Sequence, residues 1–242
     1  MSTFQDYFAD HAASSFARQM ALADIIGERP WGIDMQKGQL RFGDDLEYGV
    51  QLLGTHAFEP RTWLWVWANT QSNLPPQLIE TALRIRQLGK DQTVEAFTQP
   101  SLQLCEITDH MIAMTCSGLA GGLCYYRAPY EGGALFVLLD DVPVEVLASV
   151  SLPRVCTVLT EVVSQFDVDH RRMVTSFLQQ QGLRTESNGG ASIRAERTGE
   201  GHVEIAFDEL GRISNVATSL GPAVPALGAQ EKTKRSRWQF WK

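Results

Sequence analysis

The sequence of 242 residues lacks several features that would assign it to a specialised class of protein. Its longest strongly apolar run, ALFVLL, falls far short of the ~20 residues that span a bilayer, so we expect no transmembrane helix. The N-terminal stretch MSTFQDYFADHAASSFARQM has no basic start followed by an apolar run. We therefore expect no signal peptide and a cytoplasmic location.

Cysteine is scarce, and the four cysteines include no CxxC pair. In a chain with 44% hydrophobic residues, such widely spaced cysteines favour reduced thiols that pack as small apolar side chains over a disulfide framework. A chain of this length can bury a core without metals or disulfides. We therefore expect no structural metal and no cofactor. The cysteines are Cys105, Cys116, Cys124 and Cys156.

Motifs with a known catalytic or phosphate-binding mechanism are also missing. The stretch GLAGG does not follow a strand and does not fit GxGxxG, and no GxxxxGK[ST], GxSxG or HExxH pattern occurs. These absences favour a non-catalytic protein but do not exclude an enzyme.

Net positive charge is lacking as well, since the formal net charge is −7. Nucleic acid is therefore an unexpected partner, because phosphate binding relies on clustered Lys and Arg. The charge is uneven along the chain. After the linker-like GPAVPALGAQ, the segment EKTKRSRWQFWK has five basic residues against one acidic, a net +4, which leaves about −11 for the preceding chain.

Apolar spacing predicts four helical regions. Residues at four-residue intervals from Phe4 to Met20 predict a first helix that ends near Gly27. SNLPPQLIETALRIRQLG predicts a second helix, which Gly89 would cap, and a shorter one begins near Thr108. The stretch SLPRVCTVLTEVVSQFDVDHRRMVTSFLQQQG predicts a helix in two halves, the second capped by Asp167.

The remaining segments predict strands. IDMQKGQLRFGDDLEYGVQLLGT is typical of a β-meander, TWLWVWANT of a further strand, and LCYYRA and ALFVLL of a hairpin through PYEGG. Four short strands follow Gly182, with turns at SNGG, TGEG and DELG. Hairpins of this kind build an antiparallel meander sheet with helices packed on it, an α+β fold. We expect one domain over residues 1–221 and a flexible tail over residues 222–242.

Several landmarks occur in an order that resembles a bacterial family catalogued as a domain of unknown function. They are LLGT, TWLWVWAN, RQLG, YYRAPYEGGALFVL, DVDHRRMVTSFLQQQG and VEIAFDELGRI. The resemblance extends over residues 3–220, and Val66 stands where the family commonly has alanine. It implies a single domain and no assigned activity.

Three tryptophans alternate in TWLWVWANT, at Trp63, Trp65 and Trp67. Alternate residues of a strand share one face, so the indoles could stack bases or sugars. Such stacking surfaces usually have basic neighbours, and only Arg61 is nearby. We therefore assign the three tryptophans to the structural core.

Three further groups of residues are candidates for chemistry. Asp167, Asp169 and His170 could bind a metal, but helix capping explains the same residues. Cys105 and His110 alone are too little for a nucleophile–base pair. A candidate ligand or catalytic pocket combines one histidine, three tyrosines and one arginine: His110, Tyr125, Tyr126, Arg127 and Tyr130.

The tail combines basic and aromatic side chains, a composition that suits a partner's groove, an anionic membrane, the acidic body of the same chain, or a solubilising end without a partner. The candidate partner-binding residues are Lys234, Arg235, Arg237, Trp238, Phe240 and Trp241.

The sequence thus favours a non-catalytic cytoplasmic protein that binds another protein, either as an acidic inhibitor of immunity type or as an adaptor. Two alternatives remain open. One is a ligand-binding protein or enzyme with its pocket near residues 125–130, and the other is a protein that associates with membranes through the tail.

Overall fold

The computed structural model of the protein describes residues 2–221, and its contacts divide the chain into two compact units. Unit 1 is Met1–Ala148 and unit 2 is Ser149–Lys242. Each unit combines helices with an antiparallel sheet, which confirms the α+β class. The single domain over residues 1–221 stays a prediction that unfolding experiments can check.

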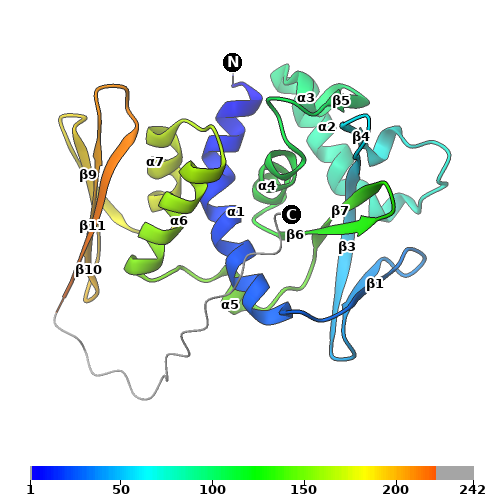
Figure 1. Ribbon diagram of the computed structural model, residues 1–242, viewed down its shortest axis with the longest axis horizontal. Helices are drawn as coiled ribbons and strands as arrows, with labels where there is room; N and C mark the ends of the chain where they lie inside the picture. The colour runs from blue at the N-terminus through cyan, green and yellow to red at the C-terminus, as the bar shows by residue number, and fades with distance from the viewer. Residues whose placement is uncertain (1, 222–242) are drawn as a thin grey trace. The chain divides into compact units, whose positions relative to one another are not determined.

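Unit 1 is built around a curled antiparallel sheet of seven strands (Figure 1). The central strand, β3, is twelve residues long. Its start pairs with β2, its end pairs with β4, and β7 runs along its other side. β1 extends the sheet beyond β2, β5 beyond β4, and β6 beyond β7. The strands are β1 (Trp31–Asp34), β2 (Gln39–Phe42), β3 (Leu46–Ala57), β4 (Thr62–Trp65), β5 (Ser101–Gln103), β6 (Cys124–Tyr130) and β7 (Gly133–Leu139).

The helices of unit 1 include two that pack closely on each other, α1 and α4. α1 begins with a capping box between Thr3 and Asp6 and buries the predicted apolar stripe. A Cβ at Gly118 on α4 would overlap the His11 ring on α1, so the close approach requires glycine. The helices are α1 (Phe4–Ile26), α2 (Glu80–Gln92), α3 (Glu95–Thr98), α4 (Asp109–Leu119) and α5 (Val144–Leu147), with short 3₁₀ turns at Val66–Ala68 and Pro76–Leu78.

The tryptophan segment is a strand only as far as Trp65. Trp63 and Trp65 are 0% exposed and meet edge to face at 5.6 Å between ring centroids. Trp67 lies in the following 3₁₀ turn and is half-buried, stacked beside Trp65 and 4.0 Å beneath the Arg86 guanidinium. The Trp65 indole N–H donates to the Ala96 carbonyl at 3.0 Å. Two of the indoles therefore lie in the core of unit 1, and the third lies at its border.

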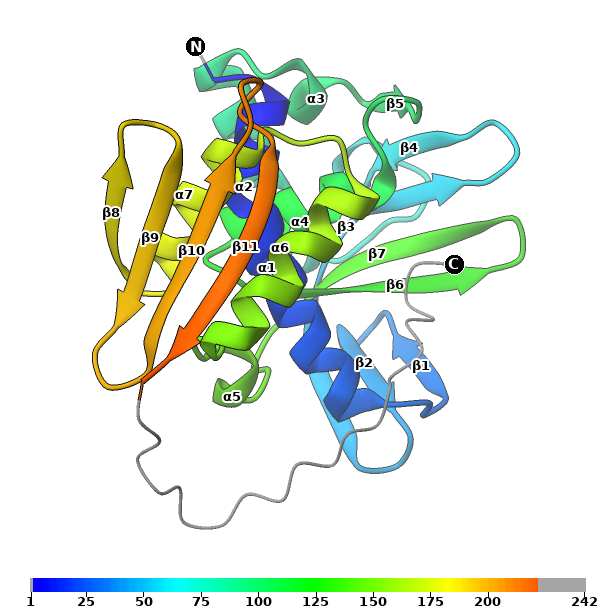
Figure 2. The same ribbon diagram turned by 60° about the vertical axis from the view of Figure 1, so that its left-hand side comes forward.

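Unit 2 is a four-stranded antiparallel meander with two helices (Figure 2). The strand order is β11-β10-β9-β8, and α6 packs against β10 and β11 while α7 packs near β8. Alternate residues of β9 and β10 are buried, as expected for a sheet with one covered face. The elements are α6 (Leu152–Gln165), α7 (His170–Gln180), β8 (Arg184–Asn188), β9 (Ser192–Arg197), β10 (Gly201–Phe207) and β11 (Ile213–Leu220).

Three local predictions are wrong. Asp169, rather than Asp167, caps α7 by accepting from the Arg172 amide at 2.9 Å. α2 continues past Gly89 to Gln92, because Gly89 is needed for packing: a Cβ there would lie 2.5 Å from Phe97.

The third concerns the cysteines. Cys105 is exposed rather than packed in the core, whereas Cys116 and Cys124 are buried.

No helix within residues 2–221 is long and apolar enough to cross a membrane.

Candidate functional site

A polar cluster in unit 1 forms where strand β3 meets the start of helix α4. His56, near the end of β3, places its Nδ1 2.7 Å from Asp109 Oδ2. Asp109 is the first residue of α4, after Thr108, whose hydroxyl caps the helix by accepting from the Met111 amide. A carboxylate at this position is favoured by the helix dipole. The cluster therefore rests on two regular elements that are 53 residues apart in the sequence.

Arg127 of β6 completes the charge balance around Asp109. Its Nε lies 3.9 Å from the carboxylate oxygen that His56 contacts. Its guanidinium lies over the Phe58 ring at 5.3 Å, and Phe58 also meets the His56 ring edge to face at 5.1 Å. Asp109 is only 8% exposed, so these two partners offset much of the cost of burying its charge.

His110 and Tyr125 form a second pair beside the first. His110 Nδ1 lies 2.8 Å from the Tyr125 hydroxyl. Burial lowers the pKa of His110 to about 4, which Asp109 counteracts in part. Burial also raises the pKa of Tyr125 well above its ordinary value. At neutral pH this pair is therefore uncharged.

The structure brings together three of the five predicted pocket residues. His110, Tyr125 and Arg127 all lie in or beside the cluster, and the Gln19 side chain of α1 bonds to both backbone groups of Tyr125 at 2.8 and 3.0 Å. Tyr126 points to the opposite face of β6, where it packs on Phe42.

Tyr130, at the end of β6, is 50% exposed. The sequence reasoning missed His56 and Asp109. Asp109 adjoins His110 in the sequence, but only strand pairing brings His56 near.

The His56–Asp109 pair has the geometry of an oriented base. An ionised carboxylate only accepts hydrogen bonds, so in the neutral form of the imidazole the pair assigns the hydrogen to Nδ1 and the lone pair to Nε2. Within residues 2–221, the buried His56 Nε2 has no hydrogen-bond partner. Such an atom could accept a proton from a hydroxyl or hold a water molecule.

The segment DVDH has a structural role in unit 2. Asp169 caps α7, and His170 Nδ1 accepts from the Ile213 amide at 2.9 Å, which fixes the start of β11 against α7. No group of three potential metal ligands occurs within the described residues. The contacts of Asp169 and His170 are therefore accounted for by the fold.

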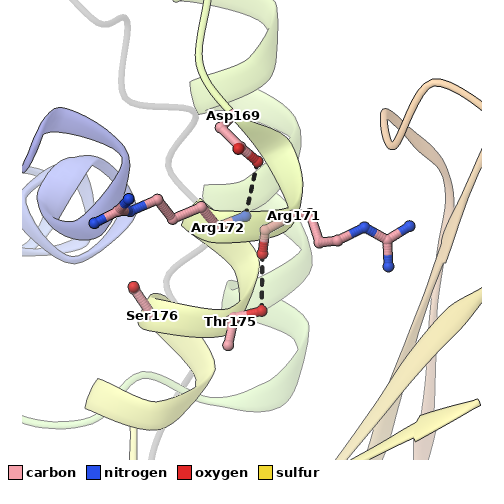
Figure 3. A pocket seen from close by; sticks show the side chains of 5 residues that line it. All are labelled: Asp169, Arg171, Arg172, Thr175 and Ser176. Carbon is pink, nitrogen blue, oxygen red and sulfur yellow. Dashed lines mark hydrogen bonds between the residues drawn. The ribbon is translucent and has the colours of Figure 1, made fainter. Parts of the chain in front are cut away.

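An open depression of about 320 Å³ lies along α7. In Figure 3, Arg171 and Arg172 point to opposite sides of the helix, so their charges do not converge. Arg171 instead packs over the Phe207 ring at 4.4 Å. The lining residues are Asp169, Arg171, Arg172, Thr175 and Ser176.

The clearest surface feature of unit 2 is the edge strand β11. It ends the sheet order, so within residues 2–221 no strand pairs with its outer side (Figure 2). The Gly221 amide donates to the Glu200 carbonyl at 2.9 Å. Because bonded pairs alternate in an antiparallel ladder, the backbone groups of Val216, Thr218 and Leu220 face away from β10. Among the described residues, no other strand uses these groups.

The six candidate tail residues, from Lys234 to Trp241, lie outside the described residues. The partner and membrane contacts expected for them therefore stay predictions.

Fold and site together define an α+β protein with a part-buried His–Asp cluster in one unit and, within residues 2–221, an open sheet edge in the other. The chain belongs to DUF6882, a family of unknown function, whose family model matches residues 5–142. This range contains the His56–Asp109 cluster and lies within unit 1. The landmarks DVDHRRMVTSFLQQQG and VEIAFDELGRI fall outside it. No curated protein and no solved structure matches the chain.

Proposed function

We propose that the protein is a non-catalytic cytoplasmic adaptor that binds another protein chain by adding a strand to β11 of unit 2. The observation behind this proposal is the open outer side of β11 within the described residues. Main-chain hydrogen bonds to an exposed edge are a recurring mode of protein recognition.

The chemistry of β11 supports this function. Its sequence, ISNVATSL, contains no charged residue and no proline. Natural sheets usually protect their edges with charges, proline or very short strands. The opposite edge follows that rule, because β8 is shorter and carries Arg184 and Glu186. β11 is therefore the longer of the two edge strands, and it lacks the charges and proline that usually prevent an edge from pairing with another strand.

The charge of unit 1 adds a preference for basic partners. Between residues 1 and 148 there are nine Lys and Arg against eighteen Asp and Glu, a formal net charge of −9. Residues 149–221 have seven against nine, a formal net charge of −2. A field of this sign accelerates encounters with basic proteins, which fits an inhibitor or adaptor.

A capture experiment followed by titration tests the edge directly. The full chain and a Thr218→Pro variant are used to retain proteins from bacterial lysate, and a retained protein is then purified and titrated. Thr218→Pro removes an outward-facing amide that no β10 group uses, so the partner's Kd should rise at least about tenfold, the cost of one or two backbone hydrogen bonds.

The matched control is Ser187→Pro. It makes the same change at the outward face of β8, the other edge, and should leave the Kd unchanged. Equal retention and equal Kd for the wild type and Thr218→Pro would refute binding through β11.

A second candidate function, ligand binding or catalysis, is favoured by the buried His56 Nε2, which has no hydrogen-bond partner in the described part of the chain. If this atom acts as a base, His56→Gln should abolish turnover or binding of a hydroxyl-bearing ligand while the protein remains folded. A screen of small hydroxyl compounds by thermal shift tests this. Unchanged shifts in His56→Gln would exclude a role for the histidine.

A further inference from the structure

The side chains on the two faces of β11 indicate which kind of strand can pair with its outer edge. Thr218 points toward α6, where its hydroxyl lies 2.7 Å from the Cys156 sulfur. Val216 and Leu220 each lie two residues from Thr218, so their side chains share this covered face of the sheet. Ala217 and Ser219 lie between them on the open face. Leu220 is 63% exposed although it is apolar. A suitable strand would cover Leu220 and bring no unpaired charge.

The regular part of β11 begins after a bulge. The register with β10 shifts between Ala206 and Phe207, which leaves Ser214 as the extra residue on β11. Regular pairing can therefore use three residues with outward backbone groups, Val216, Thr218 and Leu220. The centre of this set is Thr218.

We infer that β11 pairs antiparallel with β11 of a second copy of this chain, about a two-fold axis at Thr218. This inference rests on the proposed function and names a second copy as the chain that adds the strand. The pairing uses the uncharged strand β11 of unit 2 and not the acidic surface of unit 1, which remains for basic proteins. Thr218 then faces Thr218 of the second copy, and Val216 faces Leu220 on both sides of the axis. Each of the three pairs contributes two backbone hydrogen bonds, about six in all.

The side chains of β11 fit this arrangement. On the covered face, Val216 packs against the exposed Leu220 of the other copy, which removes apolar surface from water. On the open face, Ala217 lies opposite Ser219, and both are small. The strand has no charge, so a two-fold axis places no like charges together. Two sheets of four strands become one of eight, and the edge is closed in both copies.

Paired charges on the open face test the inference. Ala217→Lys/Ser219→Lys places two like-charged pairs across the axis, whereas Ala217→Lys/Ser219→Glu places two opposite-charged pairs at the same positions. Both residues are exposed, so each variant should fold like the wild type. Mass is measured by light scattering up to about 100 μM, a concentration that populates complexes of micromolar Kd.

The wild type and the Lys/Glu variant should have twice the monomer mass of 26.9 kDa, and the Lys/Lys variant should be monomeric. A wild type that stays monomeric, or a Lys/Lys variant that stays dimeric, would overturn the inference. A monomeric wild type whose captured partner still depends on Thr218 would leave the proposed function intact. The two claims can therefore fail separately.

Cross-linking tests the register in a Cys105→Ser background, because Cys105 is the exposed native thiol. Ala217→Cys mixed with Ser219→Cys should form a disulfide-linked pair, since these positions are adjacent and not hydrogen-bonded to each other across the axis. Each variant alone should remain unlinked. Linkage of Ala217→Cys with itself would overturn the stated axis.

Discussion

Acid should destabilise unit 1 through His110. Burial lowers the pKa of this side chain from 6.5 to about 4 in the folded protein. As the pH falls below 6.5, the unfolded chain takes up a proton that the folded chain refuses. The contribution of His110 to the free energy of unfolding is therefore constant above pH 6.5 and declines as the pH falls from 6.5 to about 4.

The size of the effect follows from the two pKa values. A difference of about 2.5 pH units corresponds to about 3.4 kcal/mol once both states are protonated. At pH 5 the loss is about 2 kcal/mol, because the unfolded state is almost fully protonated there and the folded state hardly at all. This loss is a large part of the free energy of unfolding of a native protein, which is typically about 5–15 kcal/mol.

Urea unfolding followed by tryptophan fluorescence measures this loss, since Trp63 and Trp65 are buried in unit 1. The wild type is compared with His110→Asn, whose amide group can hydrogen-bond with the Tyr125 hydroxyl in either direction. The asparagine variant should lose about 2 kcal/mol less than the wild type between pH 7.5 and pH 5.

Tyr125→Phe serves as the control for the cause of the shift. It removes the hydrogen bond but leaves His110 buried, and burial is the largest cause of the lowered pKa. This variant should keep the acid sensitivity of the wild type. Parallel declines in the wild type and His110→Asn would show that His110 is not the residue responsible.

Three further predictions concern packing, domain organisation and thiol access. Gly89→Ala should lower the free energy of unfolding by about 1–3 kcal/mol, measured with denaturant, because the new Cβ meets Phe97. This loss is expected although alanine usually favours a helix. Gly32→Ala, with open space around it, is the neutral control. Within residues 2–221, tryptophan fluorescence reports on unit 1 alone, whereas circular dichroism reports on both units. If residues 1–221 form one domain, the two signals should give coincident unfolding curves. Separate midpoints would show two domains. Cys105 should react first with a thiol reagent in the native protein, because Cys116 and Cys124 are buried and burial raises the pKa of Cys124 to about 12; mass mapping that finds Cys116 labelled as fast would contradict this burial.

Local patterns in the sequence were sufficient for most elements. The four-residue spacing from Phe4 to Met20 and the turn residues of the hairpins depend on neighbours along the chain, so α1, the β6–β7 hairpin and the final meander were predictable. The Trp65–Trp67 stretch was not. Its alternation continues the strand pattern, but the chain turns after Trp65 into a 3₁₀ turn, and Trp67 lies under Arg86.

The candidate site was predictable only in part, for a similar reason. His110, Tyr125 and Arg127 are close in sequence or on one hairpin strand, and polar residues in such a group attract notice. His56 entered the cluster because β7 pairs with both β3 and β6, a contact between distant segments that no local spacing encodes.

What the sequence determined by itself was the α+β class, the acidic body and the approximate positions of most helices and turns, since each follows from composition or short-range periodicity. The tertiary structure alone decided that Asp109 meets His56, that Gly89 is a packing residue, and that β11 ends its sheet with an open side among the described residues. These features depend on which strands pair, and strand pairing is set by the burial of whole faces rather than by any one segment.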